Sequence, residues 1–356
     1  MGVNPDFWAG RRIFLTGHTG FKGAWLSLWL QRLGAHVTGF SLAPPTIPSL
    51  YQIAEVGDGM TSIMGDVRNL LALEGAIEKA RAEIVIHLAA QSLVRRSYVD
   101  PIETLTTNVI GTANVLEAAR NFPTTKALII VTSDKCYENS ETGRNYVESD
   151  PLGGYDLYSA SKACAEIVTS AYRSSFFEPR VSSELAIASV RAGNVIGGGD
   201  WAHDRLIPDV MRSFASGKKA LLRNPNAVRP WQHVLEPLSG YLVLSEKLIE
   251  EGSAFAEAWN FGPNPKNVTH VGEVADLIAK AWNASPGWSL DSAPHPHEAT
   301  ILSLDSSKSK KRLLWNPKLD LATTLNWTID WYRRNAAGTD ARILTLEQVD
   351  RYMESA

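Results

Sequence analysis

Two pairs of residues in this sequence could exchange protons with a substrate. Asp134 and Lys135 follow Ser133 and the apolar run LIIV, so a carboxylic acid and an amine end a segment that reads as a buried strand. An acid beside an amine offers a proton donor and, when the amine is neutral, a proton acceptor. Tyr158 and Lys162 are four residues apart, which places the phenol and the amine on one face of a helix. A nearby ammonium would lower the pKa of the phenol, so that it could take a proton from an alcohol while hydride leaves the same carbon.

A glycine-rich turn, Gly17-His-Thr-Gly-Phe-Lys-Gly23, lies directly between an apolar segment and a helix-like stretch. Without side chains at its three glycines, the backbone can turn sharply and let a pyrophosphate approach the free N–H groups of a helix start. The spacing is G-x-x-G-x-x-G instead of G-x-G-x-x-G, and an ordinary tight turn is the alternative. The position between strand and helix favours a dinucleotide site.

The residues that would read the ribose favour NAD over NADP. About 20 positions after the glycines, where an acidic residue usually holds the ribose hydroxyls, the chain has Ser41. No arginine occurs within SLAPPT to receive a 2′-phosphate. Asp66 in MGDVRN is placed to meet the adenine end, and a turn or helix-capping aspartate is the alternative.

The elements that must position these residues alternate along the first half of the chain. Six apolar, β-rich segments are separated mostly by helix-like stretches such as WLSLWLQRLG, and this order predicts a doubly wound α/β fold with a parallel sheet. Tyr158 and Lys162 fall in a helix expected from about Asp156 to Phe177. The six strands are expected at residues 12–17, 35–41, 60–67, 83–90, 127–133 and 184–197.

Composition excludes several classes of protein. The 35 basic and 38 acidic residues give a net charge of −3 without runs of like charge, so neither nucleic acid nor a membrane surface is expected as a partner. The cysteines, Cys136 and Cys164, form no C-x-x-C pair, and we expect no disulfide, no metal site and a reducing cytoplasm. No leader is expected, and no apolar run approaches the roughly 20 residues that cross a bilayer.

With 10 tyrosines, a lysine four positions on arises by chance at roughly even odds, so the order of the motifs matters. A glycine turn on strand one, Ser133 after strand five and Tyr158 with Lys162 on the next helix resemble the extended branch of the short-chain dehydrogenase/reductase family, over nearly the whole chain. TGHTGFKG is similar to its Thr-Gly-x-x-Gly-Phe-x-Gly, HLAAQSLVRRS to its segment under the nicotinamide, and Asn108 to its asparagine. The resemblance implies a catalytic set of Asn108, Ser133, Tyr158 and Lys162. The cofactor residues would be Gly17, Thr19, Gly20, Phe21, Lys22, Gly23, Asp66, Val67, Leu88, Ala89, Ala90, Tyr158 and Lys162.

The same resemblance implies a nucleotide-sugar substrate. RAGNVIGGGDWAHDRLIPDVM is similar to the stretch that binds the diphosphate, and Arg229 in NAVRPWQHV matches an arginine that clamps a phosphate. A solvated surface role is the alternative for Arg205. The expected organisation is an NAD-binding Rossmann domain at residues 1–190, with a return near 231–262, and a smaller, mainly nucleotide-sugar-binding part at 191–356. The expected substrate residues are Gln91, Ser92, Asn194, Arg205, Leu206 and Arg229.

The acid and the amine after strand five favour one branch of this family. In nucleotide-sugar 4,6-dehydratases an Asp and a Glu follow the catalytic Ser or Thr, and here Asp134 and Lys135 stand in those places. Asp134 would be the acid, and Lys135 the base if burial or neighbouring charge keeps part of it neutral; a surface ion pair is the alternative.

Two other functions remain open from the sequence. A nucleotide-sugar 4-epimerase has no use for this acid and amine, and a silent dinucleotide-binding redox sensor would not need the intact Ser133, Tyr158 and Lys162. The resemblance also implies a homo-oligomer, a dimer or tetramer, paired through the helices that carry Asn108 and Tyr158.

Overall fold

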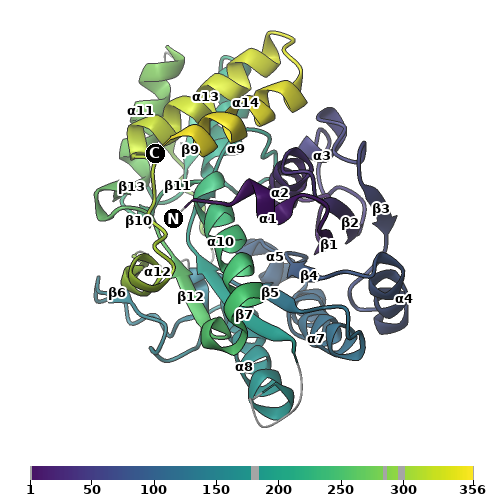
Figure 1. Cartoon of the computed structure of the whole chain (residues 1–356). Coiled ribbons are helices and arrows are strands. Elements are labelled where there is room, and N and C mark those ends of the chain that lie inside the picture. The colour runs from purple at the N-terminus through teal and green to yellow at the C-terminus, as the bar shows by residue number, and fades with distance from the viewer. Residues whose placement is uncertain (1, 178–183, 284–286, 296–300, 356) are drawn as a thin grey trace.

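The computed structural model describes residues 2–177, 184–283, 287–295 and 301–355. Its centre is a parallel sheet of seven strands in the order β12-β7-β5-β4-β1-β2-β3 (Figure 1). Each of the six predicted segments contributes a strand to this sheet, although the sixth ends at Ala192 and its last residues form the separate strand β8 (Val195–Ile196); β12 was not predicted as a strand. The strands are β1 Arg12–Thr16, β2 His36–Ser41, β3 Thr61–Met64, β4 Ile84–His87, β5 Ala127–Val131, β7 Ala186–Ala192 and β12 Ala258–Phe261.

Alternate residues of the central strands enter two separate apolar cores. Ile13 and Leu15 of β1 belong to one core, while Phe14 between them belongs to the other, because successive side chains point to opposite faces. A sheet covered on both faces therefore reads as continuous apolar runs. On one face lie α2 (Phe21–Arg32) and α10 (Leu235–Glu251); on the other lie α4 (Leu70–Ala80), α7 (Gly111–Asn121) and α8 (Leu157–Phe176).

The helix α8 forms as the sequence predicts. Asp156 caps its first turn by accepting a hydrogen bond from the backbone N–H of Ser159, and Phe177 follows its last turn. Order along the sheet reverses between β1 and β4, and ligands of such folds bind outside the carboxyl ends of the strands at this place. The candidate residues of the first half of the chain gather there.

The second half of the chain is shared between the sheet and a smaller layer. Figure 1 shows α9 (Leu206–Ala215), α11 (Val271–Trp282) and α13 (Leu321–Ala336) grouped beyond one end of the sheet, whereas α10 and β12 return to it. The last helix, α14 (Ala341–Glu354), packs on α2. Trp315, Trp327 and Trp331 are buried, in agreement with the packing role expected of the Trp-rich tail.

The remaining elements are short or belong to the smaller layer. The helices are α1 Pro5–Trp8, α3 Leu50–Ile53, α5 Val94–Val99, α6 Pro101–Leu105, α9 Leu206–Ala215, α11 Val271–Trp282, α12 Ser307–Arg312 and α13 Leu321–Ala336. One π-helical segment, η1 Thr106–Ile110, and three 3-10 turns, η2 Asp134–Cys136, η3 Gly252–Phe255 and η4 Pro265–Asn267, complete the helical set of the described residues. The two-residue and three-residue strands pair as β6 Asn145–Tyr146 with β15 Ser303–Leu304, β8 Val195–Ile196 with β11 Gln232–His233, β9 Ala220–Leu222 with β14 Trp288–Leu290, and β10 Val228–Pro230 with β13 Val268–His270.

Candidate active site

The glycine turn after β1 has no room for side chains. Gly17 has a φ of +77°, and a Cβ built on it would lie 2.7 Å from the backbone nitrogen of Ala89. A Cβ on Gly23 would lie 2.1 Å from the carbonyl oxygen of Gly17. Helix α2 begins beside this turn, and Gly20 at its N-cap offers no side-chain hydrogen bond, so the first N–H groups of α2 are available to an anion. The turn therefore fits the pyrophosphate of a dinucleotide.

The ribose end of this site is lined by hydroxyl groups and a neutral imidazole. Thr19 and Ser41 share a hydrogen bond of 2.8 Å between their Oγ atoms. His18, which the sequence reading did not select, occupies the space over Gly39 and lies 2.7 Å from Ser62 through its Nε2. Burial lowers the pKa of His18 to about 4, so the ring is uncharged at neutral pH. In the sequence, Gly39 could have indicated the place of His18, because a residue without a side chain leaves room for the imidazole ring.

Asp66 forms a turn. Its Oδ1 accepts the backbone N–H of Arg68 at 2.9 Å, and its carboxylate pairs with the guanidinium of the same arginine. The cap of α4 belongs instead to Asn69, whose side chain accepts the N–H of Ala72. Val67 is buried beneath this turn and contacts the position of Gly111.

Asn108 fastens the loop after β4 to helix α8. Its Nδ2 donates to the carbonyl of Gln91 and to Oγ of Ser161, both at 2.9 Å, and its Oδ1 accepts the N–H of Gln91. These three bonds define a positioning role for Asn108. Leu88 and Ala89 of the same loop close over the glycine turn through their backbone. Ala90 and Ser92 are the remaining predicted residues of the loop; Ala90 is half-buried and Ser92 is exposed.

Tyr158 and Lys162 are both buried on the inner side of α8, at 7% and 6% exposure. The nitrogen Nζ of Lys162 lies 3.3 Å from the carbonyl oxygen of Val131 at the end of β5. Burial lowers the pKa of Lys162 to about 8, and the negative charge of Glu166 opposes this shift.

The expected lowering of the Tyr158 pKa is wrong for this structure. Burial raises it to about 12, because removal from water penalises the phenolate more than its neighbours stabilise it. A hydrogen bond with Ser133 and the charge of Arg205 act in the opposite direction, and the charge of Asp134 adds to the rise.

Ser133 caps the turn η2, which follows β5 and begins with Asp134 and Lys135. The Oγ of Ser133 accepts the N–H of Lys135 at 3.2 Å and donates to Oδ1 of Asp134 at 2.9 Å. Asp134 is 3% exposed, and burial raises its pKa although Lys135, Ser133 and Arg229 oppose the shift. Lys135 is half-buried. The carboxyl group at this turn is therefore suited to hold a proton and deliver it.

Lys22 reaches from the glycine turn towards the same place. Its Nζ lies 3.5 Å from the hydroxyl oxygen of Tyr241. The charges of Lys162, Arg205 and Asp134 all act on this amine. Burial, together with the charges of Arg205 and Lys162, lowers the pKa of Lys22 to about 7. The turn, η2, α8 and the segment before α9 thus meet in one cluster.

Arg205 spans two loops of the cluster. Its guanidinium pairs with Asp200 at 2.9 Å and donates to Oγ of Ser92 at 3.0 Å. Leu206 follows as the first residue of α9. The charge of Arg205 lowers the pKa of Tyr158. This arginine, which we predicted to bind the diphosphate, therefore lies near the phenol.

Arg229 and Asn194 approach the cluster from its other side. Arg229 in β10 is 8% exposed, and its charge acts on Asp134. Gly193 also lies close to Asp134, because a Cβ built on Gly193 would lie 2.9 Å from Oδ2 of Asp134. Asn194 is half-buried and joins β11 by accepting the N–H of Gln232 through its backbone carbonyl.

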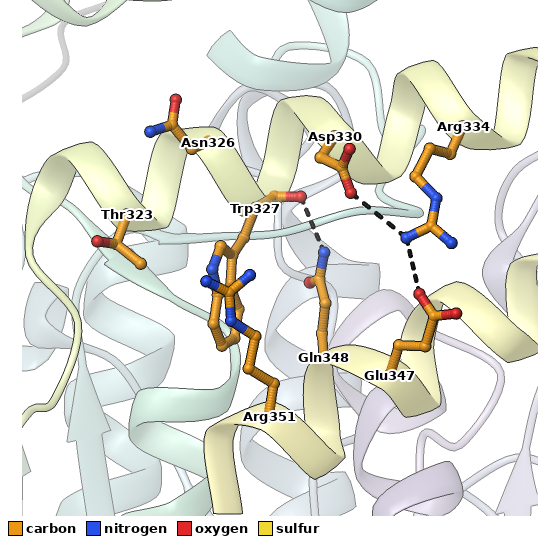
Figure 2. Close-up of a pocket in the computed structure, with 8 residues that line it drawn as sticks. All are labelled: Thr323, Asn326, Trp327, Asp330, Arg334, Glu347, Gln348 and Arg351. Atoms are coloured by element: carbon orange, nitrogen blue, oxygen red, sulfur yellow. Dashed lines mark hydrogen bonds and ion pairs between the residues drawn. The ribbon is translucent and has the colours of Figure 1, made fainter. Parts of the chain in front are cut away.

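A separate hollow of about 290 Å³ lies between α13 and α14, away from these residues (Figure 2). Its walls are tied together: Arg334 pairs with Asp330 and Glu347, and the guanidinium of Arg351 lies 4.7 Å from the ring centre of Trp327. None of its lining residues belongs to the cluster described above. We interpret the hollow as a gap in helix packing; its lining is Thr323, Asn326, Trp327, Asp330, Arg334, Glu347, Gln348 and Arg351.

Two observations concern metals and membranes. Among the described residues no group of three His, Cys, Asp or Glu side chains could hold a metal ion. Within the same residues, no helix combines the length and the apolarity needed to cross a membrane. Cys136 and Cys164 are free thiols.

A doubly wound sheet with a glycine turn after β1 and a Tyr-Lys pair on the helix after β5 defines a dinucleotide-dependent enzyme of the extended short-chain dehydrogenase/reductase class. The chain belongs to the GDP-mannose 4,6 dehydratase family, whose model matches residues 14–328. A CDP-glucose 4,6-dehydratase of Salmonella typhimurium is 48% identical over 355 residues, 99% of each chain.

Solved structures share the fold. A dTDP-glucose 4,6-dehydratase of Bacillus anthracis in complex with NAD has a TM-score of 0.76 at 24% identity and covers 92% of this chain and 98% of its own. The epimerase Mth375 of Methanothermobacter thermautotrophicus has a TM-score of 0.80 at 20% identity, with 94% and 95% covered. Dehydratases and epimerases thus share this architecture, and the fold does not separate them.

Proposed function

We propose that this protein is an NAD-dependent CDP-glucose 4,6-dehydratase, which converts CDP-glucose to CDP-4-keto-6-deoxyglucose and water. The observation that carries the proposal is the buried Asp134, hydrogen-bonded to Ser133 beside Tyr158. The 48% identity to an enzyme of that name supports the cytidine nucleotide. The stretches SDKCYEN, WAHDRLIPDV and RPWQHV also resemble that enzyme.

NAD is the cofactor that the site residues fit. The turn around Gly17 and Gly23 would receive its pyrophosphate, Thr19 and Ser41 would face a ribose, and Leu88 to Ala90 would lie under the nicotinamide. When bound, the nicotinamide supplies an acceptor for the hydride of carbon 4 and a donor of hydride to carbon 6. Purified protein should prefer NAD to NADP, and equal activity with both would contradict the ribose argument.

The first proton transfer is assigned to Tyr158. As a phenolate it would take the proton of the carbon 4 hydroxyl while hydride leaves that carbon, which turns the alcohol into a ketone. With a pKa of about 12 the phenol must lose its proton against the cost of burial, so Ser133 and Arg205, which both lower this pKa, are needed in place. Lys162 lies one helical turn beyond Tyr158 on α8, and its ammonium would also favour the phenolate form of Tyr158.

The elimination step is assigned to the turn after β5. The ketone at carbon 4 makes the proton on carbon 5 acidic, so a base can remove it while an acid protonates the hydroxyl of carbon 6, which leaves as water. Asp134 would give the proton, because burial raises its pKa. Lys135, which directly follows Asp134 in the turn η2, would in its neutral form take the proton from carbon 5. Return of hydride to carbon 6 and of the proton to carbon 5 completes the product.

Binding of the diphosphate is assigned to cationic side chains at the rim of the cluster. Arg205 acts electrostatically on Tyr158, and Arg229 acts electrostatically on Asp134, so each arginine lies near one of the reacting groups. Asn194 lies next to Gly193, which contacts Asp134. An arginine can contact two phosphate oxygens at once, which suits a diphosphate.

We further propose a homo-oligomer, a dimer or tetramer, paired through the face of α6, η1 and α8. Ile102 and Ile110 are 66% and 52% exposed, and Ile167 on α8 is 54% exposed, so an apolar surface gathers near the helices that carry Asn108 and Tyr158. The cytoplasm is the proposed compartment, because free thiols fit a reducing environment. The product would feed the synthesis of 3,6-dideoxyhexoses for bacterial lipopolysaccharide O-antigen.

Turnover on four substrates tests the proposal. The protein with NAD should convert CDP-glucose to a keto-sugar, detected by its absorbance in alkali, faster than UDP-, dTDP- or GDP-glucose. A 4-epimerase would form a new hexose without keto-sugar, and a redox sensor would consume none of the four. Faster turnover of dTDP- or GDP-glucose would keep the dehydratase and reject the cytidine nucleotide.

A further inference from the structure

A buried carboxylate that the proposed reaction does not use lies one helical turn beyond Lys162. Glu166 is 3% exposed and accepts three side-chain hydrogen bonds, one from the residue that follows β5 and two from β7. Its Oε1 accepts the hydroxyl of Thr132 at 2.5 Å, and its Oε2 accepts the hydroxyl of Ser189 at 2.7 Å and a guanidinium N–H of Arg191 at 2.8 Å. A residue this deeply buried and this fully bonded has one fixed position.

The partners of Glu166 tie together the two segments that carry the proposed chemistry. Thr132 directly precedes Ser133 and the acid–amine turn, whereas Glu166 itself belongs to the helix of Tyr158 and Lys162. Arg191 extends the network by donating to the hydroxyl of Tyr137 at 2.7 Å, just after the turn. The network therefore fixes the end of β5 against α8.

The charge of Glu166 also reaches Lys162. Residues four apart on a helix are neighbours on its surface, and Glu166 stands in this relation to Lys162. The groups that face or influence Lys162 come from every element around it: Tyr158 and Glu166 from α8, Cys136 from η2, His87 from β4, Lys22 from α2 and the carbonyl of Val131 from β5. Only Glu166 in this group carries a full negative charge at neutral pH, since burial raises the pKa of the Cys136 thiol and lowers that of His87 to about 3.

We propose that Glu166 is a positioning residue of the dehydratase, which keeps Lys162 as an ammonium and holds it in register with the turn at Ser133 and Asp134. This inference rests on the proposed function for the step that Lys162 serves.

The electrostatics agree with this geometry. Burial opposes ionisation of Glu166, but the charge of Arg191 and the hydrogen bonds of Arg191, Thr132 and Ser189 outweigh it and lower the pKa of the carboxyl. The resulting carboxylate acts against the burial that brings the pKa of Lys162 down to about 8. Without it, Lys162 would lose its proton at a lower pH.

The test compares Glu166→Gln with Glu166→Asp and a matched control. In Glu166→Gln, the alkaline limb of the pH profile of kcat/KM on CDP-glucose should move to lower pH by about one unit. Glu166→Asp keeps the charge and should restore most of the native profile. Glu246→Gln makes the same substitution at a buried carboxylate that binds Trp8 and Asn4, and should leave the profile in place.

A second variant separates charge from folding. Glu166→Gln leaves the Arg191 charge buried without its partner, which can unfold the protein, whereas the double variant Glu166→Gln/Arg191→Met removes both charges. The alkaline limb of the pH profile of kcat/KM should move to lower pH in the double variant as well. A native limb in a folded variant without Glu166, or an equal shift in Glu246→Gln, would overturn the proposal.

The pH dependence of NAD binding in the absence of sugar distinguishes this inference from the proposed function. As pH is raised, the affinity for NAD should begin to fall at a lower pH in Glu166→Gln than in the native protein. This shift should be seen whichever nucleotide sugar is the substrate. If CDP-glucose is not converted but this shift is seen, the function fails and the role of Glu166 stands. If CDP-glucose is converted and neither profile shifts, the role of Glu166 fails alone.

Discussion

Replacement of Asp134 by Asn separates the elimination from the hydride transfer. The side chain is 3% exposed and accepts the hydroxyl of Ser133 at 2.9 Å, and the amide oxygen of Asn can keep this bond at nearly the same volume. The amide cannot serve as an acid of comparable strength, so the step that protonates the leaving hydroxyl should slow by about 10²–10⁴-fold. This corresponds to about 3–6 kcal/mol of barrier, at about 1.4 kcal/mol for each tenfold.

A single-turnover experiment with NAD and CDP-glucose measures both steps. In Asp134→Asn, reduced nicotinamide should accumulate on the protein, seen by its ultraviolet absorbance, while keto-sugar release slows. Asp150→Asn is a suitable control, because Asp150 accepts the N–H of Val147 in a loop outside the cluster. Native release of keto-sugar in Asp134→Asn would refute its role as the acid. Absence of any reduced nicotinamide would assign it to sugar positioning.

Three further outcomes are expected. Tyr158→Phe keeps the ring but not the hydroxyl, so turnover should fall by about 10²–10⁴-fold with substrate binding retained in calorimetry; near-native turnover would make the Tyr-Lys spacing a coincidence. Gly23→Ala would bring a Cβ to 2.1 Å from the carbonyl oxygen of Gly17 and should abolish NAD binding in a fluorescence titration, which unchanged affinity would contradict. Burial lowers the pKa of both His87 and His233 from 6.5 to about 3, so the unfolded chain gains protons first as pH falls. Their contribution to stability is present above pH 6.5 and is lost towards pH 3, and a urea midpoint that stays constant across that window would show that they contribute nothing.

The central strands of the sheet, β1, β4, β5 and β7, were predictable because they are buried on both faces. Each reads as a short apolar run bounded by turn residues, as in ALIIV of β5, and the alternation with helices fixes the parallel order. The strand β12 escaped prediction because AWNF contains the polar Asn260 and lies far along the chain from its neighbour β7. Such pairing depends on tertiary contacts that no local pattern reveals.

The cluster was predictable by position but not by electrostatics. Spacing along α8 and the ends of β1 and β5 indicated that Tyr158, Lys162 and Asp134 would converge. The sequence suggested a lowered pKa for Tyr158, whereas burial outweighs the hydrogen bond of Ser133 and the charge of Arg205 and raises that pKa to about 12. Depth of burial depends on what the second half of the chain places over the site. For the same reason, the bonds of Glu166 could not be read from the residues alone.

The fate of the hydrogen on carbon 4 distinguishes a 4,6-dehydratase from an epimerase and from an ordinary dehydrogenase. CDP-glucose that carries deuterium on carbon 4 should be incubated with the protein and NAD, and the product analysed by nuclear magnetic resonance. The account predicts a 4-keto-6-deoxy sugar with deuterium on carbon 6, because the hydride removed from carbon 4 is returned within the same active site. Deuterium retained on carbon 4 of a hexose would indicate an epimerase, and deuterium lost to free reduced NAD would indicate an ordinary dehydrogenase; either result would contradict the account.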